Sequence, residues 1–269
     1  MRRVWLRAGA LALAAVAVLV ALTVYFSTEK VPRCLVSGVD RWHRPTDRGA
    51  HRYEVVVVRG DACFVDMDRK QQVGGYVKLS AAPWLAPSVR GARKAAAATT
   101  LTVADGERAV VYTTERGLLG FRVFDPAQFK RYTVTFKGFT WNPRFGPDPP
   151  SHGLSLAPDR PELWVLDAPN GVVHIFDVSG VPRERPRQLE NVRLSKPLSG
   201  DENPCSHACG RIGFLRHSAD GRFVYVGDSG DVIDVETRDS VANVEALHNS
   251  RVFFELDVVD GRPVFPRAG

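Results

Sequence analysis

The chain has 269 residues, of which 44% are hydrophobic and 25% are charged, and its formal net charge is +6. This composition is ordinary for a globular chain and excludes an intrinsically disordered one. Half of the net charge lies in residues 1–30, and in the rest of the chain basic and acidic residues are interleaved. Nucleic-acid binders usually concentrate basic residues on one face or element, so we expect no nucleic-acid partner.

The first predicted element is a transmembrane helix over residues 8–26. These 19 residues carry no charge, and about 20 apolar residues are needed to cross the hydrocarbon core as a helix. Residues 1–7 contain three arginines, and positive charge beside a first helix tends to stay in the cytoplasm. We therefore predict a single-pass protein of the cell membrane whose C-terminal domain is extracytoplasmic. A cleaved signal peptide is the alternative, but the apolar run is longer than the roughly 7–15 residues of a signal core.

Four cysteines agree with an exported domain, because disulfides persist in oxidising compartments. Cys205 and Cys209 are close enough in sequence for a local disulfide. Cys34 and Cys63 are then left to join the start of the domain to its first strands. A metal site that uses the closely spaced cysteines and a nearby histidine is the alternative. Structural zinc usually takes four ligands in two recognisable pairs, so we expect no metal.

Residues 27–50 are predicted to form a linker, and residues 51–269 a folded domain of short apolar runs separated by turn residues. Residues 55–65 have the pattern of a β-hairpin and are interpreted as a degenerate first copy of the repeat described below. Residues 80–98 are rich in Ala, Arg and Pro and indicate only a loop or a short helix. Further strands are expected over residues 76–79, 109–112, 251–257 and 262–265.

The chain beyond residue 100 contains three copies of one unit. Each copy begins with an Asp in a turn, continues with an apolar strand, and ends with a second apolar strand closed by another Asp. The opening residues are Asp105, Asp159 and Asp220, and the closing residues are Asp125, Asp177 and Asp234. A closing Asp is interpreted as a turn cap, because its side chain accepts hydrogen bonds from nearby backbone amides. The side chains expected between blades are Trp164, Tyr225, Phe176 and Phe124.

Such a unit cannot bury both of its faces alone, whereas stacked copies can. Four-stranded antiparallel blades around a channel fit the pattern best, so the predicted fold class is an all-β propeller. The 219 residues after position 50 allow about five blades of roughly 40–45 residues. The ring is therefore expected to be small or incomplete, and one of the last two strands could complete the N-terminal blade.

Two segments resemble the YncE-like, YVTN-repeat β-propeller family. The first runs from His152-Gly-Leu-Ser-Leu-Ala-Pro-Asp159 to Val173-His-Ile-Phe-Asp177, and the second is His217-Ser-Ala-Asp220 through Asp231-Val-Ile-Asp234. The resemblance is clear over residues 150–260 and weaker over 100–136. It implies a secreted or periplasmic propeller, commonly of seven blades, in a family whose members often have no assigned activity.

The candidate binding residues are His152 and His217, with Asp228 nearby. Each histidine lies at an end of the first strand of its repeat, and the innermost strands of a propeller line its channel, so these side chains could form a channel face. A histidine that bonds backbone at the channel wall is the alternative. No nucleophile elbow, phosphate-binding loop or zinc-protease motif is present, and we therefore assign no catalytic residue and no cofactor.

The leading functional hypothesis is a binding or scaffold module for an unknown ligand or protein partner. Residues 181–212 are the predicted contact surface, because this long segment interrupts the repeat, and loops on rigid scaffolds carry function. One alternative is an enzyme with a channel site near His152 and His217, since some propellers related by the resemblance are lactonases or metal- or quinone-dependent oxidoreductases. The other is a partial propeller without independent activity.

Overall fold

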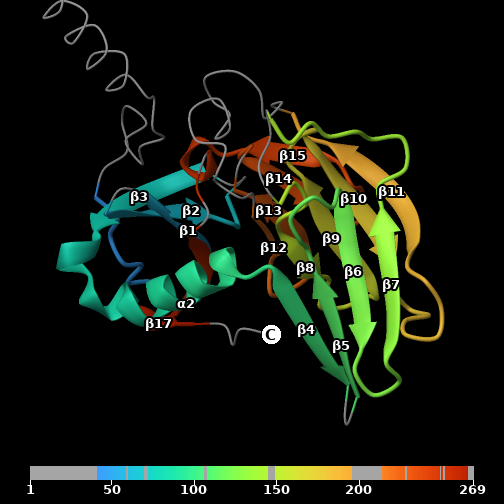
Figure 1. The fold of residues 1–269 in the computed structure, drawn as a ribbon. Helices are drawn as coiled ribbons and strands as arrows, with labels where there is room; N and C mark the ends of the chain where they lie inside the picture. Colours follow the sequence, from blue (N-terminus) through green and yellow to red (C-terminus); the bar gives the residue numbers. More distant parts are fainter. Residues whose placement is uncertain are drawn as a thin grey trace, which may run out of the picture. The chain divides into compact units, whose positions relative to one another are not determined.

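The computed structural model describes residues 41–265, except residues 59, 70–71, 106–107, 145–148, 196–213, 228, 249 and 251. All described residues belong to one unit of the chain, Pro32–Gly269. Their strands form four antiparallel sheets (Figure 1). The predicted anchor and most of the predicted linker lie outside the described residues. Within the described part, no helix is long and apolar enough to cross a membrane.

Three sheets have four strands each, in which the spatial order follows the chain order; we call them the first, second and third blades. The first blade consists of β4 (Thr100–Asp105), β5 (Arg108–Thr113), β6 (Gly120–Asp125) and β7 (Lys130–Thr135). The second consists of β8 (Leu154–Leu156), β9 (Glu162–Asp167), β10 (Val172–Asp177) and β11 (Arg187–Arg193). The third consists of β12 (Leu215–His217), β13 (Phe223–Val226), β14 (Asp231–Asp234) and β15 (Ser240–Asn243), followed by the short turn η3 (Glu245–Leu247). Each predicted repeat is therefore the central hairpin of a blade, which confirms the all-β, four-stranded architecture.

The fourth sheet, here the terminal sheet, joins the two ends of the described chain in the order β17-β16-β1-β2-β3. Its strands are β1 (Ala50–Val58), β2 (Asp61–Asp66), β3 (Gln72–Lys78), β16 (Phe253–Val259) and β17 (Arg262–Val264). β16 pairs with β1 over seven residues, from Ala50↔Val259 to Val56↔Phe253. This pairing confirms that a C-terminal strand completes the N-terminal sheet.

The Asp that closes each repeat caps the turn that follows it. Asp125 Oδ1 accepts hydrogen bonds from the backbone N–H groups of Ala127 (2.8 Å) and Gln128 (3.2 Å). Asp234 Oδ1 accepts equivalent bonds at 3.0 Å in the third blade, and Asp66 Oδ1 does so in the terminal sheet. The shared cap shows why Asp recurs at this position, and it identifies the N-terminal hairpin as a further copy of the unit.

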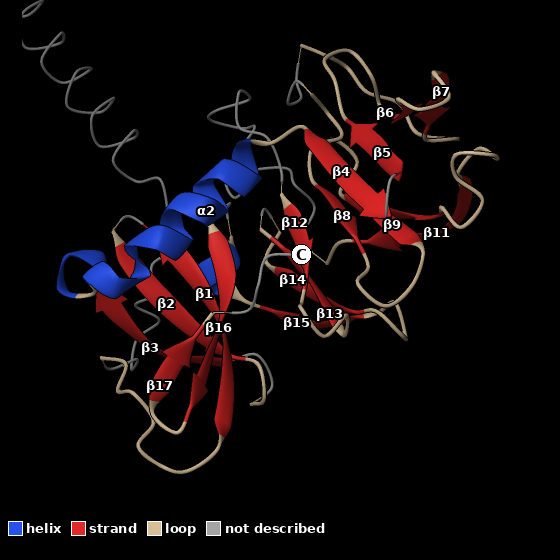
Figure 2. Ribbon diagram, turned by 90° about the horizontal axis from the view of Figure 1, so that it is seen from below, coloured by secondary structure: helices blue, strands red, loops and turns tan. Residues whose placement is uncertain are grey.

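Residues 79–97, which include most of the segment 80–98 predicted to be a loop or a short helix, form two short turns and one helix. They are η1 (Leu79–Ala81), η2 (Pro83–Leu85) and α2 (Ala86–Ala97). Val89, Ala92 and Ala96 are buried along one side of α2, the spacing of an amphipathic helix. Leu85, Val89 and Ala92 pack with side chains of the terminal sheet, and Figure 2 shows α2 beside this sheet. The described residues form four sheets, where the chain length predicted about five blades.

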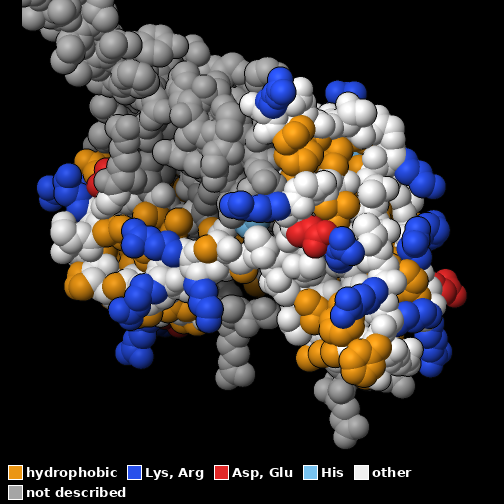
Figure 3. Space-filling model, in the orientation of Figure 1, with side chains coloured by type: hydrophobic (Ala, Val, Ile, Leu, Met, Phe, Trp, Pro, Cys, Tyr) orange, Lys and Arg blue, Asp and Glu red, His pale blue; other side chains and the backbone are white. Residues whose placement is uncertain are grey.

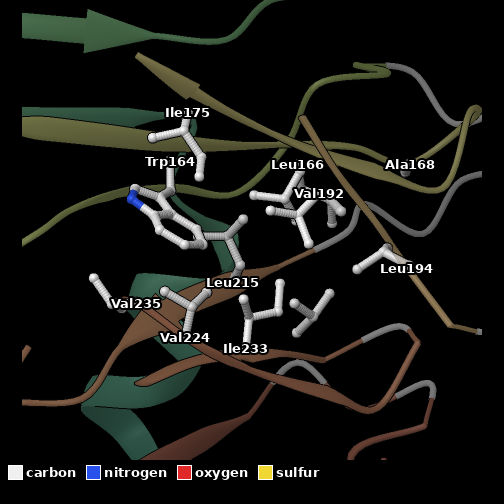
Figure 4. Close-up of a cluster of buried hydrophobic side chains, with 12 residues drawn as sticks. Trp164, Leu166, Ala168, Ile175, Val192, Leu194, Leu215, Val224, Ile233 and Val235 are labelled. Atoms are coloured by element: carbon white, nitrogen blue, oxygen red, sulfur yellow. The ribbon is translucent and has the colours of Figure 1, made fainter. Parts of the chain in front are cut away.

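Apolar clusters join neighbouring blades. Between the second and third blades lie Trp164, Leu166, Ile175, Leu215, Val224 and Ile233 (Figure 4). Phe176 joins the second blade to the first, where its ring lies 5.0 Å from that of Phe121. Trp164 and Phe176 therefore fill the inter-blade positions that the sequence predicted. Phe124 is only half-buried, because it alternates with Phe121 to the other face of β6, where the Arg131 guanidinium lies over its ring at 4.9 Å.

Candidate functional site

The two predicted histidines lie at β8 and β12, the neighbouring first strands of the second and third blades. His152 is fully buried directly before β8, and His217 ends β12 with 6% of its surface exposed. His217 Nδ1 lies 2.8 Å from Ser155 Oγ, and its ring packs edge-on against Trp164 at 5.4 Å. Ser155, the residue that His217 contacts, comes three residues after His152, which is a separation of roughly 10 Å along an extended strand. The third predicted member, Asp228, lies outside the described residues, so the channel face stays a prediction.

His217 has the surroundings of a core histidine. Burial lowers the pKa of His217 to about 3, only partly opposed by the charge of Asp159. The imidazole is therefore neutral at physiological pH. Among the described residues, no three His, Cys, Asp or Glu side chains are grouped so that they could hold a metal ion.

Cys63 is the only cysteine among the described residues. It lies fully buried on β2 and is disulfide-bonded. Because Cys34, Cys205 and Cys209 all lie outside the described residues, the pairings remain predictions.

A buried acid pair lies where the terminal sheet meets the third blade. Glu54 on β1 and Glu255 on β16 are direct cross-strand partners. Glu54 is fully buried, and neither of its carboxyl oxygens has a hydrogen-bond partner in the described structure. Glu255 Oε1 and Oε2 each accept the backbone N–H of Ala219 at 2.9 Å, and Arg216 Nη2 lies 3.8 Å from Oε2. The hydrogen-bond donors that stabilise a carboxylate therefore contact Glu255 and not Glu54.

The proton of this pair therefore resides on Glu54. Burial raises the pKa of Glu54 from an ordinary 4.5 to about 8; Arg216 opposes this rise, and the Glu255 charge adds to it. Burial also raises the pKa of Glu255, against the opposing effects of Arg216 and the Ala219 N–H. Like charges directly opposite on paired strands are destabilising, which a single retained proton avoids. Because Glu54 has no exposed surface, the pair is a titrating element inside the fold rather than a site that a ligand can reach.

The predicted contact segment, residues 181–212, is only partly a loop, because residues 187–193 form β11. Its first residues belong to the turn of residues 178–186, which connects β10 to β11 and is fixed to the first blade. Tyr132 on β7 donates its hydroxyl to the carbonyls of Pro182 and Arg183, both at 3.0 Å. Lys130 Nζ donates to the same Arg183 carbonyl at 2.7 Å. Side chains of one blade thus hold the turn of the next in a defined position.

We give the name basic edge to Phe129, Lys130 and Arg131 at the start of β7 together with Arg183 and Arg185 of the turn; Arg131 lies on the opposite face of β7 from Lys130 and Tyr132, over the ring of Phe124. The three arginines are exposed, and none forms an ion pair within the described part of the chain. The acid within the segment, Glu184, is exposed as well. Lys and Arg side chains line the right-hand edge of the face in Figure 3, where Figure 1 places β7 and β11.

Phe129 is the most exposed large hydrophobic residue of the described chain, with 81% of its surface accessible. It ends the turn between β6 and β7 with φ = 52°, a left-handed conformation that bulky residues rarely adopt. The fold therefore holds an aromatic ring in solvent at the start of β7, at some conformational cost. Arg238, at the same turn position after Asp234, has φ = 60°, so the positive φ belongs to the repeated turn, and the exposed ring is what distinguishes Phe129; sequence reasoning missed this residue.

No family model matches the sequence, and no curated protein matches it. Among solved structures, hydrazine synthase from Kuenenia stuttgartiensis is 16% identical with a TM-score of 0.33, over 49% of this chain and 31% of that one. Dihydro-heme d1 dehydrogenase NirN in complex with DHE is 14% identical with a TM-score of 0.36, over 71% and 34%. The complex of KlAtg21 with the coiled coil of AgAtg16 is 12% identical with a TM-score of 0.34, over 69% and 53%. The chain covers about a third to a half of these structures, and the similarity to these β-propeller proteins is distant.

Proposed function

We propose that this chain is a membrane-anchored, extracytoplasmic binding module that presents its basic edge to a protein partner. The observation that carries the proposal is the turn at residues 182–183, which side chains of β7 hold in place while Arg183 and Arg185 stay exposed and without an ion pair in the described structure. Phe129, with its exposed ring, directly precedes β7. Arginine and aromatic residues are the side chains that most often dominate binding energy at interfaces. The four-sheet scaffold supplies the rigidity that such a surface requires.

The anchor and the compartment rest on independent support. Residues 8–26 are long and apolar enough to span a membrane as a helix, and three arginines precede them. The disulfide bond of Cys63 is typical of a domain that folds outside the cytoplasm. A reporter enzyme that is active only outside the cytoplasm, fused after Gly269, should be active in cells; activity of a cytoplasm-only reporter instead would refute this orientation.

Binding at the basic edge is tested by site-specific photocrosslinking of the full chain in cells. A photoreactive amino acid replaces Phe129 in one variant and Val241 in another. Val241 is the matched control, because it is a large exposed hydrophobic residue, with 52% of its surface accessible, on the outermost strand of the third blade. We expect a discrete protein adduct at position 129 and none at 241. Absence of an adduct at 129, or equal adducts at both positions, would contradict the proposal.

A further inference from the structure

From the charges around the basic edge we infer that its partner is an acidic, extended protein segment that lies along β7 and beside the turn at residues 182–185. This inference rests on the proposed function and names the chemistry of the partner. It depends on three features of the described structure: the pairing of the neighbouring acids, the outer edge of β7, and the environment of Phe129.

Carboxylates on β9, β10 and β11 form ion pairs with arginines. Asp177 Oδ2 accepts a bond from Arg187 Nη2 at 2.9 Å. Glu190 and Glu162 are both bonded by Arg238, at 2.6 and 2.9 Å.

The guanidinium groups of the edge are not paired in this way. Arg183 and Arg185 make no ion pair in the described structure, and the contact that Arg131 makes is with the ring of Phe124. The two arginines of the turn are therefore exposed, with one exposed acid, Glu184, between them in sequence, and Arg131 is exposed on β7. An arginine presents its donors in a planar fork that matches a carboxylate, so carboxylate side chains are the groups that complete this surface.

The form of the partner follows from β7. This strand is the outermost of the first blade, and no strand among the described residues pairs with its outer edge. Such an edge presents backbone N–H and C=O groups to a further strand, and the addition of an extended segment is a common mode of peptide recognition. An anionic lipid surface would match the arginines but would leave this edge unpaired. The single exposed ring of Phe129 fits one apolar residue of a protein segment.

The turn and β7 act as one surface because Tyr132 and Lys130 bond the Arg183 carbonyl. These contacts use the backbone of Arg183 and leave its side chain exposed. Reversal of the charge at Arg183 and Arg185 therefore changes the surface without removing the contacts that hold the turn.

The test uses the full chain in cells with the photoreactive residue at position 129, and the adduct is sequenced by mass spectrometry. We expect the crosslinked segment to carry an excess of Asp and Glu. Arg183→Glu combined with Arg185→Glu should lower the adduct yield at least tenfold, whereas Arg262→Glu, an exposed arginine on β17, should leave it unchanged. Replacement of the crosslinked acids of the partner by Lys should restore the adduct in the charge-reversed chain.

A neutral or basic segment, a yield that the charge reversal leaves unchanged, or the lack of rescue would overturn the inference, although binding at the edge would stand. An adduct to lipid instead of protein would also overturn it. Absence of any adduct at position 129 would instead remove the proposed function itself.

Discussion

Glu54 provides a quantitative prediction, because a fully buried carboxyl without hydrogen bonds must affect stability as a function of pH. Its pKa is about 8 in the folded chain and an ordinary 4.5 when exposed. Between these values the folded state keeps a proton that the unfolded state releases, so stability falls as pH rises. The penalty is absent below pH 4.5 and complete above pH 8. At roughly 1.4 kcal/mol per pH unit, it amounts to at most about 5 kcal/mol.

The perturbation is Glu54→Gln, which keeps the shape of the side chain and removes its titration. The burial cost of the amide does not depend on pH, so the informative quantity is the change in the mutational effect between two pH values. The free energy of unfolding of the variant relative to the parent should rise by about 3–5 kcal/mol between pH 4.5 and pH 8.5. Glu255, Asp257 and their neighbours are present in both chains, and their own titration largely cancels in this difference.

The assay is urea unfolding of the full chain in a mild detergent, followed by tryptophan fluorescence. Glu184→Gln is the control, because Glu184 is exposed and its substitution should change stability by less than about 0.5 kcal/mol at either pH. If the two variants respond to pH alike, Glu54 does not carry the buried proton, and the reasoning about the acid pair is wrong.

Three further predictions concern His217, Tyr132 and Phe129. Because the pKa of His217 is lowered to about 3, the free energy of unfolding should fall as pH drops below 6.5, by about 3 kcal/mol at pH 4.5. In the same unfolding assay, His217→Gln should reduce this loss of stability between pH 6.5 and pH 4.5. An equal loss in the variant and the parent would refute the prediction. Tyr132→Phe removes a donor to two carbonyls and should cost about 1 kcal/mol while reducing the adduct at position 129 severalfold; a full adduct yield would show that the turn needs no such support. Phe129→Gly should raise the unfolding free energy by up to about 1 kcal/mol, since glycine accepts a positive φ. The same substitution should lower the yield of the adduct formed from a photoreactive residue at position 133 on β7. A gain of stability with an unchanged adduct yield would show that the ring of Phe129 does not contribute to binding.

The repeat architecture could be predicted because its signals are local. An Asp that closes a strand accepts bonds from amides two and three residues later, as at Asp125, so the sequence contains both the cap and its targets. The helix α2 was less predictable, because its buried side is mostly alanine, which marks a helix face weakly. Its role in covering the terminal sheet follows from the packing of Leu85 and Val89 against that sheet.

The acid pair could not be predicted because pairing of β1 with β16 joins residues that are 201 positions apart. A signal was nevertheless present, since Glu54 and Glu255 each interrupt an otherwise apolar run. One part of the basic edge was predicted, because the segment from residue 181 onward was expected to form a contact surface. The hydrogen bonds from β7 that hold this segment were not predicted, because they join residues about 50 positions apart. The histidine prediction places His152 before the first strand of its repeat and His217 at the end of the corresponding strand, and these positions are those of the structure; the channel face that the two side chains could form stays a prediction.

Labelling of single engineered cysteines in spheroplasts would test the central claim most directly. Phe129→Cys and Val241→Cys chains are treated with a membrane-impermeant maleimide, and labelling rates are compared with those of the purified proteins. An extracytoplasmic domain with an occupied basic edge predicts rapid labelling at 241 in both settings and labelling at 129 that is severalfold slower in cells than in the purified chain. No labelling of either cysteine in spheroplasts would contradict the orientation, and equal rates at both positions would contradict a partner at the basic edge.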